Sequence, residues 1–251
     1  MSKITVALSL ICLLFGGMLG YSFAYGRIYQ EVKKERLQNF APKQPAFKVD
    51  SPLLQGTDSF AKVISETSGQ KVLPLDSVCE PVLDAIEQAA STTMAKFNRP
   101  DSPLVGLRRI NEASRHFEDS LLKILDAQPD IHCQTPLTRE GKFQRTGYPD
   151  LMLTHQPTGR VFYLDPKLYE TASRNSSLRT FYYTPRDRTS KILKNAHHLL
   201  IGFAHDGKDG QWTFESWHLV DLSKTELTLK SEYNASNKEL YHENAIIREG
   251  Q

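Results

Sequence analysis

Residues 149–167 read PDLMLTHQPTGRVFYLDPK, and this stretch decides the fold. Two apolar runs flank Gln156-Pro157-Thr158-Gly159, whose residues are typical of a turn, so the stretch predicts a β-hairpin. With the turn centred between its two middle residues, Asp150 lies opposite Asp165. Directly opposed residues of a hairpin have Cβ atoms about 5 Å apart, so the two carboxylates are expected to be neighbours.

A third charged side chain joins this pair. Side chains alternate between the two faces of a strand, so Asp165 and Lys167 share a face. Two carboxylates this close repel each other unless a cation lies between them, and hard divalent cations such as Mg²⁺ prefer oxygen ligands of this kind. The alternative is an ordinary hairpin with a surface ion pair between Lys167 and an aspartate.

Pro149-Asp150 followed by Asp165-Pro166-Lys167 resembles the motif of the PD-(D/E)XK nuclease superfamily. The resemblance covers roughly residues 103–222 as a pattern of helix, hairpin, helix and strand. It implies a restriction-endonuclease-like α/β fold with a central mixed β-sheet flanked by helices. It also implies a metal-dependent nuclease that hydrolyses phosphodiester bonds of nucleic acid, in which Mg²⁺ or Mn²⁺ positions and activates the attacking water.

The same resemblance assigns roles to individual residues. Asp150 and Asp165 would be metal ligands, and the backbone C=O of Pro166 would add a third. Lys167 would orient or deprotonate the attacking water. The family more often has Glu at the position of Asp165, and the shorter aspartate changes the reach of that ligand. Proline is unusual in a central strand, so Pro166 is expected where the hairpin splays apart.

Glu118 is the fourth predicted catalytic residue. It falls inside the apolar stripe of a helix expected from about residue 102 to 127, where an unpaired carboxylate is costly. A glutamate of the helix before the sheet often joins the metal site of the resembled family. Glu118 is therefore a candidate metal ligand, and the alternative is a structural glutamate that reaches solvent or pairs with an arginine.

Residues 174–194, after the hairpin, are basic, with interleaved aromatic residues at positions 181–183 and a single carboxylate, Asp187. Such a stretch could follow a phosphate backbone and stack bases, or could be a solvated helix face beside a buried strand. The net charge of +2 gives no global signal for nucleic-acid binding, so the contact must be local. The predicted DNA-binding residues are Arg174, Arg179, Arg186, Arg188, Lys191 and Lys194.

The N-terminal segment is expected to lie outside the fold. Lys3, the apolar run 4–19 and the small residues before Tyr25 predict a signal peptide over 1–24, and therefore an exported, periplasmic or secreted protein. The alternative is a retained membrane anchor with a cytoplasmic domain. Residues 25–75, with several prolines, are predicted to be an irregular tether, and residues 76–251 the nuclease-like domain.

Export bears on the two cysteines that a cleaved signal would leave, Cys79 and Cys133. They predict one disulfide, with two buried free thiols as the alternative.

The remaining pattern supports one α/β domain. Helices are expected over about 76–98 and 186–197, with His197 at the end of the second. Strands are expected at 131–134, 143–154, 160–168, 199–204, 212–221 and 227–233. A non-catalytic nuclease-like domain, or an exported binding protein without nuclease ancestry, are the competing functions.

Overall fold

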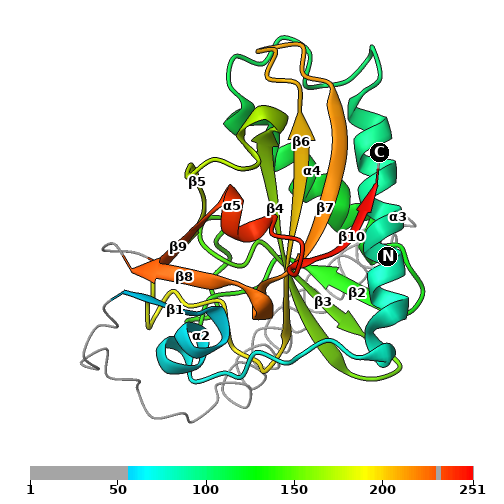
Figure 1. Ribbon diagram of the computed structural model, residues 1–251. Coiled ribbons are helices and arrows are strands. Elements are labelled where there is room, and N and C mark those ends of the chain that lie inside the picture. Colours follow the sequence, from blue (N-terminus) through cyan, green and yellow to red (C-terminus); the bar gives the residue numbers. More distant parts are fainter. Residues whose placement is uncertain (1–55, 230–232, 251) are drawn as a thin grey trace, which may run out of the picture. The chain divides into compact units, whose positions relative to one another are not determined.

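The computed structural model describes residues 56–229 and 233–250 (Figure 1). The centre of the fold is a six-stranded sheet in the order β10-β7-β6-β4-β3-β2. β4 and β6 are parallel and the other neighbours are antiparallel, so the predicted mixed sheet flanked by helices is confirmed. The strands are β2 (Ile131–Gln134), β3 (Leu151–His155), β4 (Arg160–Glu170), β6 (His197–His205), β7 (Phe214–Asp221) and β10 (Ile246–Gly250).

The hairpin β3–β4 has the predicted register. His155 pairs with Arg160 across the turn, and the ladder continues to Leu151 opposite Leu164. β3 begins at Leu151, shorter than the strand expected from residue 143, so the ladder stops one step before Asp150 and Asp165. Pro166 therefore lies beyond the paired part of the hairpin. Proline has no backbone N–H, but at this position no hydrogen bond to β3 is lost.

Two long helices, α3 (Glu80–Phe97) and α4 (Ile110–Asp126), cover one face of this sheet (Figure 1). Phe117 of α4 packs its ring 4.7 Å from the rings of Phe203 and Phe214, which belong to β6 and β7. α4 begins later than the expected residue 102. Residues 102–109 form turns instead, and Gly106 has φ of 83°, which a right-handed helix does not accept.

The opposite face of the six-stranded sheet carries a second core and a second sheet. Its strands, in the order β1-β8-β9-β5, are all antiparallel. The sequence predicted only one strand of this region, at 227–233, which overlaps β8. The other strands were missed because they have only three to five residues, and β1 and β5 pair with distant parts of the chain. The strands of this sheet are β1 (Thr57–Ser59), β5 (Arg179–Tyr183), β8 (Glu226–Leu229) and β9 (Tyr233–Ser236).

The predicted tether over residues 25–75 was wrong for its described part. β1 joins the second sheet, and α2 (Phe60–Ser68) buries Phe60, Val63 and Ile64 completely in the second core. The fold is completed by α5 (Asn237–Leu240) and by three short 3₁₀ helices, Ser77–Cys79, Thr171–Ser173 and Leu222–Lys224. Residues 25–55 of the predicted tether lie outside the described residues.

The helix predicted over residues 186–197 is absent. The segment runs as turns and extended chain, and several of its backbone groups form hydrogen bonds with distant partners. Arg139 N–H donates to the Ser190 carbonyl (2.8 Å), and Ala196 N–H donates to the Lys71 carbonyl (3.1 Å). His197 is accordingly the first residue of β6 and not the end of a helix.

The predicted disulfide is not formed, because Cys79 and Cys133 are both free and buried. Cys133 lies on β2, whereas Cys79 contacts His197 of β6, with β3 and β4 in between. Neighbouring strands are about 4.8 Å apart, so three steps exceed the reach of a disulfide. Burial also raises the pKa of the Cys133 thiol to about 12, which disfavours the reactive thiolate.

The predicted signal peptide or membrane anchor over residues 1–24 lies outside the described residues. Among the helices within 56–229 and 233–250, none combines the length and apolarity that crossing a membrane requires.

Candidate active site

The structure brings the three charged residues of the hairpin motif together. Lys167 Nζ lies 2.5 Å from Asp165 Oδ2 and 3.4 Å from Asp150 Oδ2, so one ammonium contacts both carboxylates. Lys167 also donates to the Pro166 carbonyl (3.2 Å). The group forms because strand alternation directs Asp165 and Lys167 to one face, and the hairpin register sets Asp150 opposite Asp165.

The three side chains are removed from solvent. The exposed fractions of the Asp165, Asp150 and Lys167 side chains are 2%, 13% and 24%. Burial, together with the like charge of Asp150, raises the pKa of Asp165 to about 8 against the opposing effect of Lys167. Burial alone would lower the pKa of Lys167, but the two carboxylates outweigh it and hold that pKa above its ordinary value.

Glu118 joins this group from α4. Burial raises the pKa of Glu118, and the charge of Asp150 raises it further, whereas Arg145 and Lys167 lower it. Arg145 Nη2 lies 3.0 Å from Glu118 Oε2 and 2.7 Å from Asp119 Oδ1. Glu118 thus pairs with an arginine, as the alternative expected, and is also close enough to Asp150 for the two charges to interact. Its role as a metal ligand stays a prediction. We call Asp150, Asp165 and Glu118 the acidic cluster.

The donor set of the acidic cluster suits a hard divalent cation. Carboxylate oxygens and a backbone carbonyl converge, and buried Asp165 Oδ2 accepts no hydrogen bond although an ammonium lies beside it. Burial, and after it the charge of Asp150, raises the pKa of Asp165 and of Glu118, and a bound cation would favour the charged form of both carboxylates. Within the described residues, no three His, Cys, Asp or Glu side chains are already gathered at ligand distances. Lys167 stands between the two aspartates instead.

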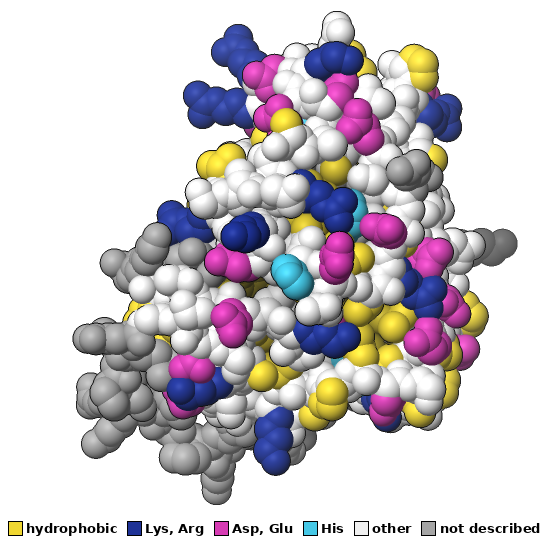
Figure 2. All heavy atoms as spheres, viewed as in Figure 1, with side chains coloured by type: hydrophobic (Ala, Val, Ile, Leu, Met, Phe, Trp, Pro, Cys, Tyr) yellow, Lys and Arg dark blue, Asp and Glu magenta, His cyan; other side chains and the backbone are white. Residues whose placement is uncertain are grey.

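The six basic residues predicted to bind DNA differ in exposure. Five of them lie at or near the surface: Arg174, Arg179, Arg186, Arg188 and Lys194. Lys191 is buried, with 2% of its surface exposed. On the face drawn in Figure 2, Lys and Arg side chains are interspersed with Asp and Glu and do not gather into one basic area.

A small cavity of about 170 Å³ lies beside the acidic cluster. Tyr148, which precedes the motif by one residue, lines it together with Gln144, Tyr182 and Arg186. Tyr182 is exposed, and the Arg179 guanidinium lies 4.3 Å from the centre of its ring. The sequence analysis missed Arg145 and this cavity, because both depend on a loop whose path has no periodic pattern.

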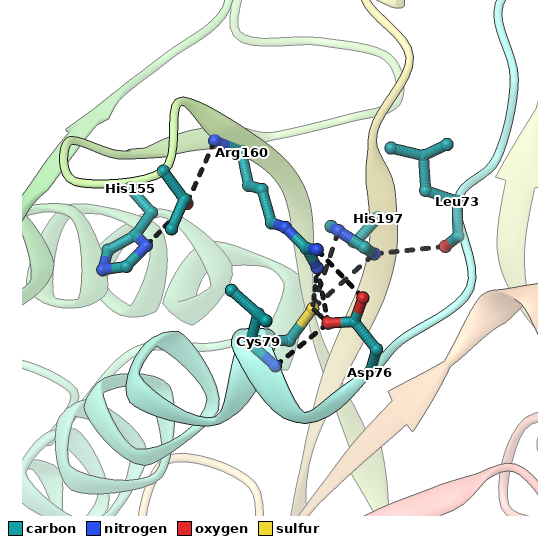
Figure 3. A network of polar contacts seen from close by, with 8 residues as sticks. Leu73, Asp76, Cys79, His155, Arg160 and His197 are labelled. Atoms are coloured by element: carbon teal, nitrogen blue, oxygen red, sulfur yellow. Dashed lines mark hydrogen bonds and ion pairs between the residues drawn. The ribbon is translucent and has the colours of Figure 1, made fainter.

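A second polar cluster lies at the other end of β4 (Figure 3). Arg160 donates to both carboxylate oxygens of Asp76, at 2.5 and 2.9 Å, and to Cys79 Sγ at 3.2 Å. His197 Nε2 lies 3.6 Å from the same sulfur, and His197 Nδ1 lies 3.2 Å from the Leu73 carbonyl oxygen. We call Asp76, Cys79, Arg160 and His197 the Arg160 cluster.

The mixed sheet, the hairpin register and the meeting of Asp150, Asp165 and Lys167 define a protein with the PD-(D/E)XK, restriction-endonuclease-like fold. The chain belongs to the MjaV family of type II restriction enzymes, whose sequence profile matches residues 54–244. It is 31% identical over 208 residues to the type II restriction enzyme MjaV of Methanocaldococcus jannaschii. That alignment covers 76% of this chain and 88% of the relative.

A solved structure with a weaker likeness is the restriction endonuclease BglI bound to its DNA recognition sequence. The TM-score is 0.34 and the identity 13%, over 58% of this chain and 72% of that one.

Family membership corrects the predicted location. The prediction of a signal peptide and of an exported or secreted protein was wrong, since the chain belongs to a family of type II restriction enzymes. The same finding gives no support to a membrane tether. The physical reason for the error is that an apolar run followed by small residues is a short compositional pattern, which is weak beside a match over most of the chain.

Proposed function

We propose that this protein is a metal-dependent endonuclease that hydrolyses phosphodiester bonds of DNA at the acidic cluster. The observation that carries the proposal is the meeting of Asp150, Asp165 and Lys167 within one salt-bridged group at the open end of the hairpin. Membership of a type II restriction enzyme family supports DNA as the substrate. The raised pKa values in the cluster also support function, since strongly perturbed groups gather at active sites.

In the proposed reaction, one water is consumed for each bond cut. The water oxygen forms a new bond to phosphorus and the bond from phosphorus to one ester oxygen breaks. The departing oxygen takes the electron pair and then a proton, which leaves a phosphate on one end and a hydroxyl on the other. Lys167 orients the attacking water and stabilises the negative charge that develops on the phosphate oxygens.

Mg²⁺ or Mn²⁺ would be held by Asp150, Asp165, Glu118 and the Pro166 carbonyl. A metal ion in such a site lowers the pKa of water and neutralises charge on the phosphate. Lys167 has two functions here, because its ammonium balances the aspartates without a metal and is free to turn towards the substrate with one.

DNA contact would come from the surface residues near the cluster. Arg174, Arg179, Arg186, Arg188 and Lys194 can donate to backbone phosphates, and Tyr182 offers an exposed ring beside the cavity. Because contacts to phosphates release counterions from DNA, this binding should weaken steeply as salt is added.

The test is cleavage of a supercoiled plasmid with Mg²⁺, with Mn²⁺ and with EDTA. Lys167→Ala should lose most cleavage and retain DNA binding, and Asp150→Asn should abolish cleavage. Each loss should be about 10²-fold or more, as expected for removal of a positioned catalytic group. Lys224→Ala and Asp101→Asn are matched surface controls, with side chains 53% and 71% exposed, and should cut like wild type.

Wild-type protein that binds DNA but cuts no substrate with either metal would show a non-catalytic nuclease-like domain. Cleavage that survives Asp150→Asn and Lys167→Ala would place the reaction elsewhere in the molecule.

A further inference from the structure

Lys191 is a buried lysine that lies outside the β3–β4 hairpin, in the extended segment before β6. Its exposed fraction is 2%, and it is among the largest fully buried side chains of the described residues. Lysine is almost never fully buried unless its charge is paired. By contrast Lys194, three residues further along, is exposed.

The backbone around Lys191 is fixed on both sides. Ser190 accepts a hydrogen bond from Arg139 N–H (2.8 Å), and Leu193 N–H donates to the Tyr163 hydroxyl (3.1 Å). Ile192 is completely buried in the second core. The side chain of Lys191 therefore starts from a rigid position, and only its four-carbon stem can move its ammonium.

The ammonium of Lys191 contacts the backbone of Arg145, a residue that pairs with the acidic cluster. Lys191 Nζ lies 3.4 Å from the Arg145 carbonyl oxygen, and Arg145 itself pairs with Glu118. The charges that act on Lys191 are those of Asp150, Asp165, Glu118 and Lys167, which are the four predicted catalytic residues. Burial lowers the pKa of Lys191, and the three carboxylates oppose that shift.

The charge balance shows why a second cation matters. The acidic cluster has three carboxylates, whereas Lys167 contributes one positive charge and Arg145 is shared with Asp119. When all three carboxylates are ionised, a phosphodiester entering such a site meets net negative charge. Lys191 is the other cation acting on all three carboxylates, and its single hydrogen bond is long, so its remaining donors are available to an anionic ligand.

We propose that Lys191 is a second catalytic cation, which contacts a non-bridging oxygen of the scissile phosphate from the side opposite Lys167. The inference rests on the proposed function and deepens it, because it names the group that holds the substrate phosphate. Lys191 transfers no proton and forms no bond. It stabilises the additional negative charge that the phosphate oxygens carry as water attacks.

The test compares Lys191→Met with Lys191→Arg and with Lys224→Met, a control at an exposed lysine outside the proposed DNA contact. Single-turnover cleavage of a plasmid with Mg²⁺ should fall about 10²-fold in Lys191→Met and stay near wild type in Lys224→Met. The conservative Lys191→Arg should recover part of the rate, because it keeps the positive charge at the same place.

A second measurement needs neither metal nor cleavage. Binding of a DNA duplex in EDTA is measured over a range of salt concentrations. If Lys191 contacts a phosphate, the slope of log affinity against log salt should decrease by about one in Lys191→Met. A lysine that only neutralises buried carboxylates would leave this slope unchanged, because it releases no counterion from DNA.

Lys191→Met could also unfold the chain, because it leaves the carboxylates less compensated. In that case Lys191→Met is combined with Glu118→Gln, because the double variant loses one positive and one negative charge and so keeps the charge balance. Its cleavage rate is compared with that of Glu118→Gln alone. The proposal is overturned by a wild-type cleavage rate in Lys191→Met, or by a reduced rate with an unchanged salt slope. If wild-type protein cuts no DNA, the proposed function fails first and takes this inference with it. If wild type cuts and Lys191→Met cuts equally well, only the inference fails.

Discussion

The two ends of β4 hold charged clusters of opposite character. At the turn end, the Arg160 guanidinium matches both oxygens of Asp76, and each partner holds the other in its charged form (Figure 3). At the other end, about 16 Å along the strand, the buried carboxylates of Asp150 and Asp165 share one ammonium, that of Lys167. The Arg160 pair lowers the pKa of Asp76 to about 2, whereas the pKa of Asp165 rises to about 8.

The difference separates a structural contact from a functional one. Asp76 is also the cap of a 3₁₀ turn, accepting from Val78 N–H at 3.0 Å, so the Arg160 cluster ties the start of α3 to the hairpin. In the proposed function a metal ion would complete the acidic cluster, whose buried carboxylates have raised pKa values. Destabilised, incompletely paired groups of this kind are typical of active sites.

Replacing Asp165 should give the largest effect on the difference between the acidic cluster and the Arg160 cluster. Asp165→Asn should lower cleavage by about 10²-fold or more, because a predicted metal ligand is lost. The same change should raise the stability of the protein in EDTA, because it removes a buried like charge beside Asp150. Cleavage of a plasmid and thermal unfolding of the same preparation measure the two effects.

The gain in stability should depend on pH. In the unfolded chain Asp165 has its ordinary pKa of 3.8, and in the folded chain about 8. Its contribution to stability is therefore fully present below pH 3.8 and is lost as the pH rises through 8. The advantage of Asp165→Asn over wild type should grow across that window, by a few kcal/mol on the order-of-magnitude scale of such shifts. Mg²⁺ should stabilise wild type and not the variant. A variant that cuts DNA, or is less stable than wild type at pH 8 in EDTA, would contradict this account.

The sequence could predict those parts of the site that depend on interactions between residues close in the chain. The pairing of Asp150 with Asp165 depends on one short turn, so it could be predicted, and the structure has that register. Glu118 follows from the period of one helix, and its place near Asp150 agrees with the apolar stripe. Such local patterns fix which side chains share a face.

Lys191 and Arg145 could not be placed in the same way. The sequence pattern of residues 186–197 predicted a helix, but hydrogen bonds to distant partners such as Arg139 hold the segment extended. The second sheet failed for the same reason, since β1 pairs with β8 across about two thirds of the chain. Tertiary contacts overrode local propensity in both places.

Replacing Glu118 should affect the acidic cluster less than replacing Asp165. Glu118→Gln removes one carboxylate from the acidic cluster but keeps the size of the side chain and an oxygen. The affinity for Mg²⁺ should fall roughly tenfold, the low end for loss of a supporting ligand, and the fold should be kept. Calorimetric titration measures the affinity, with the neighbour Asp119→Asn as the control that also contacts Arg145. Unchanged affinity in Glu118→Gln would leave Glu118 as a structural partner of Arg145.

Arg160→Met should have the smallest effect and should leave cleavage at the wild-type rate. Its pair with Asp76 lies at the surface, so the melting temperature should fall only slightly. The folded pKa of Asp76 is lowered, so the contribution of the pair is present above pH 3.8 and is lost as the pH falls through about 2. The difference in melting temperature should shrink over that interval.

The same variant has a local signature at His197. Burial lowers the pKa of His197, and the charge of Arg160 lowers it further. Removing the guanidinium should therefore raise that pKa towards its ordinary value of 6.5, which NMR titration of the imidazole would detect, while Arg160→Lys should leave it lowered. A loss of cleavage in Arg160→Met, with the melting temperature unchanged, would show that the two ends of β4 are not separate in function. The structural role of the Arg160 cluster would then have to be abandoned.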